Sequence, residues 1–366
     1  MVVAGRRPRS RALALCTVPR VGARPQTTRS HVTDHDSRYR ALLTGVTGQD
    51  GWYLARRLLA EGQEVHGIVR DAAVIDAIAA ELPGLQVHLA DLRDHDSLLR
   101  ALEAAAPDRI FNLAGSTSVA RSWEEPVETA DTIGIGAVRL LAAAWERQER
   151  TGSEIRFLQA SSAEVFGDPA TAPQSEATLR NPVTPYGAAK DFAHTMVQVY
   201  RHRGLYATAA ILYNHESPRR PPTFVARKIT AAVAAIARGR ADHLSLGNMD
   251  VLRDWGYAPD YVAAMIRILD APSPRDYVVA TGNAHSVRDF VREAFAVVGI
   301  DDWESYVSVD PGLYRPADPR ALVGDSTRLR ELGWEPTVSF SELVRTMVQA
   351  DLDELDRAAT EGEVRA

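Results

Sequence analysis

The chain has 366 residues, of which 45% are apolar and 25% are charged, and its formal net charge is −6. This composition excludes a wholly disordered or collagen-like chain, and the acidic balance gives no electrostatic reason to expect a nucleic-acid partner. No apolar stretch approaches the roughly 20 residues of a membrane-spanning helix, and the single cysteine, Cys16, excludes a disulfide framework or a cysteine-based zinc site within one chain.

The first 38 residues differ from the rest. They contain eight Arg, two Asp and no hydrophobic period. We predict that residues 1–38 are a disordered Arg-rich leader. Arg-rich, acid-poor composition is also typical of a targeting peptide, which is the alternative.

From Tyr39 onward, short apolar runs alternate with amphipathic segments. The pattern predicts strands at 40–45, 64–69, 86–89, 109–113 and 155–160, and helices at 53–61, 97–106 and 132–147. Strands that alternate with helices indicate an α/β fold with a doubly wound parallel sheet of the Rossmann type. We predict that this domain spans residues 39–213.

After residue 213 the alternation weakens and prolines gather at 218, 221 and 222. Helices are predicted at 223–238, 261–269, 287–298 and 340–356, and a strand at 277–280. We expect residues 214–356 to form mainly a smaller mixed α/β substrate-binding domain, with segments that return to the Rossmann sheet. Residues 357–366 are predicted to be a tail.

A glycine turn follows the first predicted strand. Gly45, Gly48 and Gly51 are spaced G-x-x-G-x-x-G. Glycine lets the backbone turn sharply and approach a pyrophosphate, and the N-terminus of the next helix supplies hydrogen-bond donors. The usual fingerprint is G-x-G-x-x-G, so the strand–turn–helix context supports the prediction of a dinucleotide site. The alternative is a tight turn without a ligand.

Arg70 ends the second predicted strand. An Arg at this place suits the 2′-phosphate of NADP, whereas an acidic residue would bind the ribose of NAD. Asp71 would repel the phosphate if it pointed inward. NADP is the predicted cofactor. Asp91 and Leu92 are expected to border its adenine, and a helix N-cap is the alternative role for Asp91.

Tyr186 and Lys190 are four residues apart, so on a helix they share one face. A nearby ammonium lowers the pKa of a phenol, and Tyr186 could then act as a base near neutral pH. Ser162 and Glu164 follow the fifth strand, at the edge where ligands bind in such sheets. A carboxylate beside a tyrosine base suggests a second proton movement, as in an elimination. A surface Tyr–Lys pair and a solvated Glu164 are the alternatives.

Polar and basic residues recur in the second half of the chain. They are the run Asn214–Arg220, Lys228, the segment Arg253–Trp255, and Arg315. Several cations around one pocket suit a diphosphate, because Arg pairs bidentately with phosphate.

Together these motifs resemble the GDP-mannose 4,6-dehydratase family of extended short-chain dehydrogenases/reductases, over roughly residues 40–352. The run Asn-His-Glu-Ser-Pro-Arg-Arg at 214–220 is the most specific of them. The resemblance implies oxidation at C4 with Tyr186 as base, loss of water across C5 and C6 with help from Glu164 and Ser162, and return of the hydride to C6. The implied product is GDP-4-dehydro-6-deoxy-mannose.

The resemblance also implies a set of site residues. The catalytic residues would be Ser162, Glu164, Tyr186 and Lys190. The cofactor-binding residues would be Gly45, Thr47, Gly48, Gln49, Asp50, Gly51, Arg70, Asp91, Leu92, Leu113, Ser116, Tyr186, Lys190, His215 and Arg220. GDP-mannose would be bound by Asn214, Lys228, Arg253 and Arg315. No metal site and no membrane contact are expected, and the enzyme would be a cytoplasmic homo-oligomer, either a dimer or a tetramer.

Two departures from the family pattern bear on these expectations. Ser162 stands where the family usually has Thr, which keeps the hydroxyl. Asp71, Ala72 and Ala73 replace a second Arg and a longer loop that helps to build a tetramer in the family, which makes a dimer more plausible. Three other functions stay open: an epimerase or dehydratase for another nucleotide sugar, a non-catalytic NADP-sensing protein, and a simple carbonyl reductase.

Overall fold

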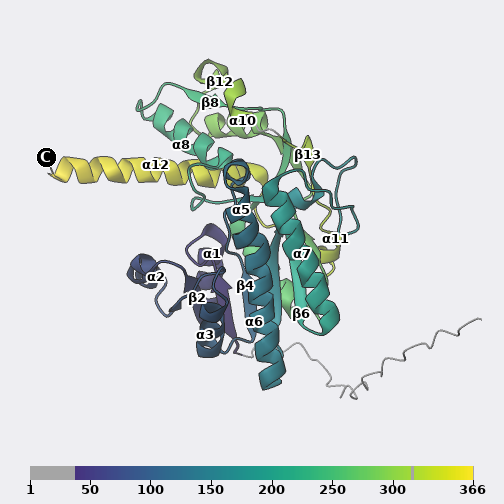
Figure 1. Ribbon diagram of the computed structural model, residues 1–366. Helices are drawn as coiled ribbons and strands as arrows, with labels where there is room; N and C mark the ends of the chain where they lie inside the picture. Colours follow the sequence, from purple (N-terminus) through teal and green to yellow (C-terminus); the bar gives the residue numbers. More distant parts are fainter. Residues whose placement is uncertain (1–37, 315–316, 366) are drawn as a thin grey trace, which may run out of the picture. The chain divides into compact units, whose positions relative to one another are not determined.

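A seven-stranded sheet, parallel at every pairing, forms the centre of the computed structural model (Figure 1). The structure describes residues 38–314 and 317–365, so the predicted leader lies outside the described residues apart from Arg38. The strand order is β3-β2-β1-β4-β5-β6-β10, formed by β1 (Arg40–Thr44), β2 (Glu64–Val69), β3 (Gln86–Leu89), β4 (Arg109–Asn112), β5 (Arg156–Ser162), β6 (Tyr206–Leu212) and β10 (Tyr277–Val279). The predicted doubly wound, Rossmann-type fold is confirmed.

Helices cover both faces of this sheet. One face packs against α3 (His95–Ala105), α6 (Gly136–Thr151) and α7 (Pro185–Arg203), and the other packs against α1 (Gln49–Ala60) and α9 (Ala258–Asp270). The neighbours Leu42 and Leu43 show the alternation, because Leu42 packs in the core beside α3 and α6 and Leu43 in the core beside α1 and α9. Both side chains are fully buried, as expected for strands covered on both faces.

Short helices occupy several connections. They are η1 (Ala72–Val74), α2 (Ile75–Glu81), α4 (Val119–Glu124), α5 (Pro126–Thr129), the π-helical η2 (Ala130–Ile135) and η3 (Ala163–Phe166). The helix predicted at 132–147 therefore begins as a π-helix and continues as α6 to Thr151. The helix predicted at 53–61 begins earlier, at Gln49, because its first turn is part of the glycine turn and carries no apolar period.

The second half of the chain adds a separate hydrophobic core, built around Trp255, Phe290 and Met347. Its elements are β7 (Asn214–Glu216), α8 (Val225–Ala237), β8 (Leu244–Leu246), β9 (Leu252–Tyr257), β11 (Ala284–Ser286), α10 (Val287–Val297), η4 (Trp303–Tyr306), β12 (Val307–Val309), η5 (Pro311–Leu313), β13 (Ala321–Leu322) and α12 (Phe340–Arg365). The last helix passes through the predicted tail, and its final turns extend away from this core (Figure 1).

The chain crosses more than once between the large sheet and the separate core around Trp255. After β7 and β9, it returns to supply α9 and β10 to the large sheet, and α11 (Thr327–Arg330) also joins that core through Leu329. Within the described residues, no helix combines the length and apolarity that crossing a bilayer requires.

A histidine pair lies at the outer edge of the large sheet. His66 Nδ1 is 2.9 Å from His88 Nε2, and His66 Nε2 is 3.1 Å from Glu64 Oε1. Burial and the charge of His66 lower the pKa of His88. Unfolding releases this constraint, so the unfolded chain takes up a proton at a pH where folded His88 does not.

We therefore expect the stability of the protein to fall as the pH drops below about 6.5, the ordinary histidine pKa. The His88→Gln variant lacks this titration, so its midpoint of thermal unfolding should depend less on pH than that of the wild type between pH 7.5 and 5.5. If the unfolding midpoints of the two proteins changed equally with pH across this range, His88 would not be the group responsible.

Candidate active site

The glycine turn joins β1 to α1 and is closed by its own backbone. The Gly48 amide donates to the Gly45 carbonyl at 2.9 Å, and Gly45 has a φ of +71°. A Cβ on Gly51 would stand 2.2 Å from the Gly45 carbonyl oxygen, so only glycine fits there. No side chain caps α1, which leaves its first-turn N–H groups available to an anion such as a pyrophosphate.

A buried polar ladder joins three neighbouring strands of the large sheet, β1, β4 and β5, beside this turn. Thr44 Oγ1 donates to Asn112 Oδ1 at 2.7 Å, and Asn112 Nδ2 donates to Gln159 Oε1 at 2.7 Å. Thr44 Oγ1 also accepts the backbone N–H of Leu113, a predicted cofactor residue. The sequence analysis missed this ladder, and its only signal was one polar residue within each apolar strand. Ser116, also predicted, lies exposed beyond it.

The residues predicted to choose the cofactor lie at the ends of β2 and β3. Arg70 is exposed, while the Asp71 carboxylate accepts the Ala73 N–H at 2.9 Å and so caps η1. Asp91 is held by Arg93, whose Nη2 lies 2.7 Å from its Oδ2. The alternative role of Asp91 as a helix cap is wrong, because Asp94 caps α3.

The side chain of Leu92 is buried in the core beside α3 and α6. Any contact between Leu92 and a cofactor would therefore be made by the Leu92 backbone.

The four predicted catalytic residues come from three elements. Ser162 ends β5 and Glu164 lies in η3, whereas Tyr186 and Lys190 lie in the first turns of α7. Thr184 caps α7 by accepting the Gly187 N–H at 2.9 Å. A Cβ on Gly187 would stand 2.6 Å from the Glu164 carbonyl oxygen, so the start of α7 packs directly on η3.

The electrostatics of Tyr186 differ from the prediction. The pKa of Tyr186 is raised to about 12, chiefly by burial. A hydrogen bond from Ser162 opposes this rise, and the charge of Glu164 adds to it. The expected lowering by Lys190 is not found, because the Lys190 ammonium donates to the Ala160 carbonyl at 2.8 Å and lies 5.8 Å from the Tyr186 ring centre. Burial also lowers the pKa of Lys190, to about 8.

Several predicted cofactor and substrate residues already have partners within the protein. His215 Nε2 lies 2.8 Å from Asp50 Oδ2, and Arg220 Nε lies 3.0 Å from Glu216 Oε2. The Lys228 ammonium donates to the Ser245 carbonyl at 2.7 Å.

The remaining predicted residues fall into three situations. Asn214 lies half-buried on β7, beside Trp255 of β9. Arg253 is buried and paired with Asp318, and it donates to the Pro319 carbonyl. Arg315 lies outside the described residues.

Arg219, part of the cationic run, is directed elsewhere. It pairs with Glu81 at 2.9 Å and stacks on Trp52 at 4.0 Å. It therefore does not join the cations of the predicted pocket.

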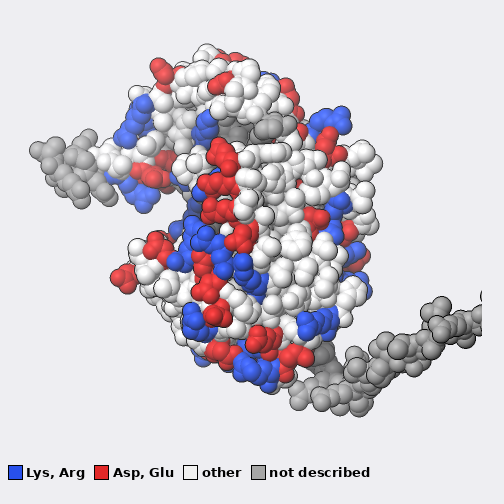
Figure 2. Space-filling model, in the orientation of Figure 1, with Lys and Arg blue, Asp and Glu red and all other residues white. Residues whose placement is uncertain are grey.

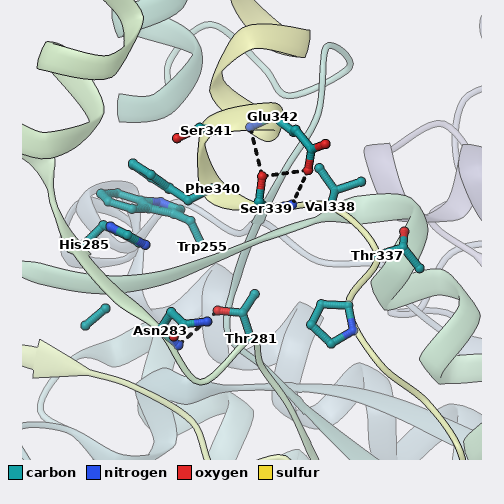
Figure 3. A pocket seen from close by; sticks show the side chains of 12 residues that line it. Trp255, Thr281, Asn283, His285, Thr337, Val338, Ser339, Phe340, Ser341 and Glu342 are labelled. Atoms are coloured by element: carbon teal, nitrogen blue, oxygen red, sulfur yellow. Dashed lines mark hydrogen bonds between the residues drawn. The ribbon is translucent and has the colours of Figure 1, made fainter.

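A cavity of about 650 Å³ lies against the core that is built around Trp255, Phe290 and Met347 (Figure 3). Trp255, His285 and Phe340 line one part of it, and His285 stacks on Phe340 with ring centres 3.8 Å apart. None of the predicted site residues lines this cavity. This cavity therefore does not coincide with the predicted catalytic and cofactor residues.

Comparison with known proteins agrees with the arrangement of the motifs. A family model described as GDP-mannose 4,6 dehydratase matches residues 42–347. GDP-mannose 4,6 dehydratase 2 of Arabidopsis thaliana is 43% identical over 325 residues, which covers 86% of this chain and 87% of the relative. The GDP-mannose 4,6 dehydratase of Homo sapiens is 41% identical over 343 residues, which covers 86% and 91%.

Solved structures show the same fold. UDP-glucose 4-epimerase of Thermus thermophilus in complex with NAD has a TM-score of 0.75 and 26% identity, over 85% of this chain and 98% of that one. The RMD protein of Pseudomonas aeruginosa complexed with NADPH has a TM-score of 0.72 and 25% identity, over 86% and 99%. One of these neighbours holds NAD and the other NADPH.

Proposed function

The chain belongs to the GDP-mannose 4,6-dehydratase family, and we propose from this that it dehydrates GDP-mannose to GDP-4-dehydro-6-deoxy-mannose with NADP. The observation that carries the proposal is the direct packing of η3, which holds Glu164, on the first turn of α7, which holds Tyr186. A dehydrogenase needs one base at C4, whereas an elimination needs a second group at C5 and C6.

The roles of the protein residues follow from their places. Tyr186 takes the proton of the 4-hydroxyl, and the hydrogen bond from Ser162 favours the phenolate form that does so. Glu164 then removes the C5 proton, which the 4-keto group has made acidic, and delivers it with the help of Ser162 to the 6-hydroxyl, which leaves as water. C5 regains a proton from solvent when the hydride is returned to C6. The dinucleotide held by the glycine turn would supply the hydride acceptor for C4 and the hydride donor for C6.

The test incubates the purified protein with GDP-mannose and a catalytic amount of NADP, and reads the nucleotide sugar by mass spectrometry. The expected product is lighter by one water, with no accumulation of NADPH. Turnover of another nucleotide sugar, but not of GDP-mannose, would mean that the proposed substrate is wrong and that the enzyme acts on that other sugar. Reduction of NADP to NADPH without loss of water would indicate a simple carbonyl reductase working in reverse, and tight NADP binding without any turnover would favour the sensing protein.

The preference for NADP rests on Arg70. Its guanidinium is exposed at the end of β2, and the neighbouring Asp71 carboxylate is directed to the cap of η1, not toward Arg70. A charge-assisted hydrogen bond contributes roughly 1.5–3 kcal/mol, so Arg70→Gln should weaken NADPH binding by about tenfold or more. Binding of NADH, which lacks the phosphate, should change little.

The measurement is a fluorescence titration with both dinucleotides. Asp71→Ala is the matched control, and it should leave the ratio of NADPH to NADH affinity nearly unchanged. An equal loss of affinity for both dinucleotides in Arg70→Gln would contradict a 2′-phosphate contact.

We also propose a homo-oligomer, through an apolar face on α4, α5, η2 and α7. This face is formed by Trp123, Val127, Ile135, Phe192 and Val199, whose exposed fractions lie between 44% and 80%. The surface over α7 is largely uncharged, in contrast to the mixed charges beside it (Figure 2). Exposed apolar patches of this kind mark association sites. A cytoplasmic location stays a prediction.

Light scattering tests the oligomer. Phe192→Glu and Val199→Glu together should reduce the mass in solution toward that of the monomer, because each buries a charge in the interface. Leu89→Glu, at an exposed apolar residue on β3, is the control and should leave the mass unchanged.

A further inference from the structure

Two consecutive residues in the first turn of α1 are bonded to a segment that follows them by more than 160 residues. Asp50 Oδ2 lies 2.8 Å from His215 Nε2, across a separation of 165 residues. Gln49 Nε2 donates to the His215 carbonyl at 3.1 Å, and Gln49 Oε1 accepts from Ser217 Oγ at 2.7 Å. These contacts fasten the glycine turn to β7 and the residue that follows it.

The ring of His215 is committed on both edges and on one face. Its Nδ1 lies 2.7 Å from the Tyr213 carbonyl oxygen, and its Nε2 faces the Asp50 carboxylate. Both partners accept hydrogen bonds, so both nitrogens carry protons and the ring is cationic. Tyr261 stacks on the ring with centres 4.5 Å apart and planes at 19°. No ring nitrogen remains to contact a dinucleotide.

The groups around the Asp50 carboxylate stabilise its charged form. Burial opposes its charge, but His215, Gln49 and Arg220 together lower the pKa of Asp50. The same carboxylate supports the charged form of Lys190, whose pKa burial lowers.

Glu216 is the other buried carboxylate near His215, and it is paired with Arg220 at 3.0 Å. The ion pair of Asp50 and His215 therefore joins the cofactor turn to β7, and its carboxylate acts on Lys190 through its charge alone.

We propose that Asp50 and His215 are positioning residues, whose buried ion pair holds the glycine turn against β7 and so fixes the amides that bind the dinucleotide. The His215 ring acts through Asp50 and does not itself contact the cofactor. The inference rests on the proposed function only in taking this turn as the NADP site. Loss of either partner leaves a buried charge alone, which disturbs both segments.

The first test follows hydrogen exchange in the protein without any ligand. Asp50→Asn and His215→Ala should each speed exchange in two peptides, residues 45–58 and 210–217, by about tenfold or more. The control is Asp351→Asn, which breaks the buried pair of Asp351 with Arg227 in the second core. The control should leave both peptides unchanged. Faster exchange only in the peptide that carries the substitution would overturn the proposal.

The second test measures NADPH affinity by fluorescence. Asp50→Asn and His215→Ala should each weaken binding by about tenfold or more, since small misplacements of a site are costly. His215→Gln keeps a donor toward Asp50 and should recover part of that loss. The double variant Asp50→Asn/His215→Ala should bind no more weakly than the poorer single variant, because the two residues act as one unit.

Additive losses in the double variant would mean that His215 contacts the cofactor itself, and would overturn the proposal. Failure of the proposed function gives a different result. In that case the wild type binds NADPH but releases no water from GDP-mannose, while the exchange and affinity results above still decide the role of the pair.

Discussion

Glu164→Gln should abolish the loss of water from GDP-mannose, with a reduction of about 10²–10⁴-fold in turnover, the usual contribution of a positioned acid–base group. Glutamine keeps the size of the side chain and removes its ability to take the C5 proton. Oxidation at C4 depends on Tyr186 and should persist. With stoichiometric NADP, the variant should therefore accumulate NADPH absorbance that the wild type shows only transiently.

Deuterium exchange separates the two steps. In heavy water the wild type should incorporate deuterium at C5, because the proton is removed there and replaced from solvent. The Glu164→Gln variant should not. Asp168→Asn, an exposed carboxylate just after η3, is the control and should behave like the wild type. Normal turnover of Glu164→Gln would remove Glu164 from the mechanism.

Lys190→Met should have two large effects of opposite sign. Turnover should fall by about 10²-fold or more, because the ammonium is part of the catalytic set. Stability at pH 7 should rise by about 1–3 kcal/mol, since burial lowers the pKa of Lys190 from 10.5 to about 8 and the charged form is costly to bury. Methionine fills a similar volume without a charge.

The sign of the pH dependence follows from the same shift. Between pH 8 and 10.5 the unfolded chain still holds the lysine proton, whereas folded Lys190 has released it. Wild-type stability therefore gains from this group as the pH rises through that window, and the advantage of Lys190→Met should disappear by its upper end.

Denaturant unfolding at several pH values measures the difference. Lys228→Met, at the partly buried second lysine, should bring no stabilisation. A lower stability of Lys190→Met at pH 7 would contradict the cost of burying the charge.

Much of the architecture could be predicted from local patterns. The strands of the first half coincide with short apolar runs, and their alternation with helices predicts the parallel sheet that the structure shows. The start of α1 was missed because glycines and polar residues, not an apolar stripe, form its first turn. The same limit hid α2, whose seven residues bury only Ile78.

The site was predictable in its residue types but not in its pairings. Motif spacing brings Ser162, Glu164, Tyr186 and Lys190 to one edge of the sheet. Spacing does not reveal that the Lys190 ammonium donates to the Ala160 carbonyl, or that the His215 ring is paired with Asp50. Such contacts join residues far apart in the chain, and a sequence pattern carries no information about which of several possible partners a charge will meet.

The repeated crossing of the chain between the two cores has a consequence for folding during synthesis. The face of the large sheet that carries Leu43 is covered only by α1 until α9 has been made, because Tyr261, Met265 and Ile268 supply the rest of that helical cover. The edge strand β10 comes later still. A nascent chain that ends near residue 213 therefore exposes apolar sheet surface and an unpaired strand, and both are recognised by chaperones and by other unfinished chains. The ribosome must deliver about 70 further residues before this half of the protein can close.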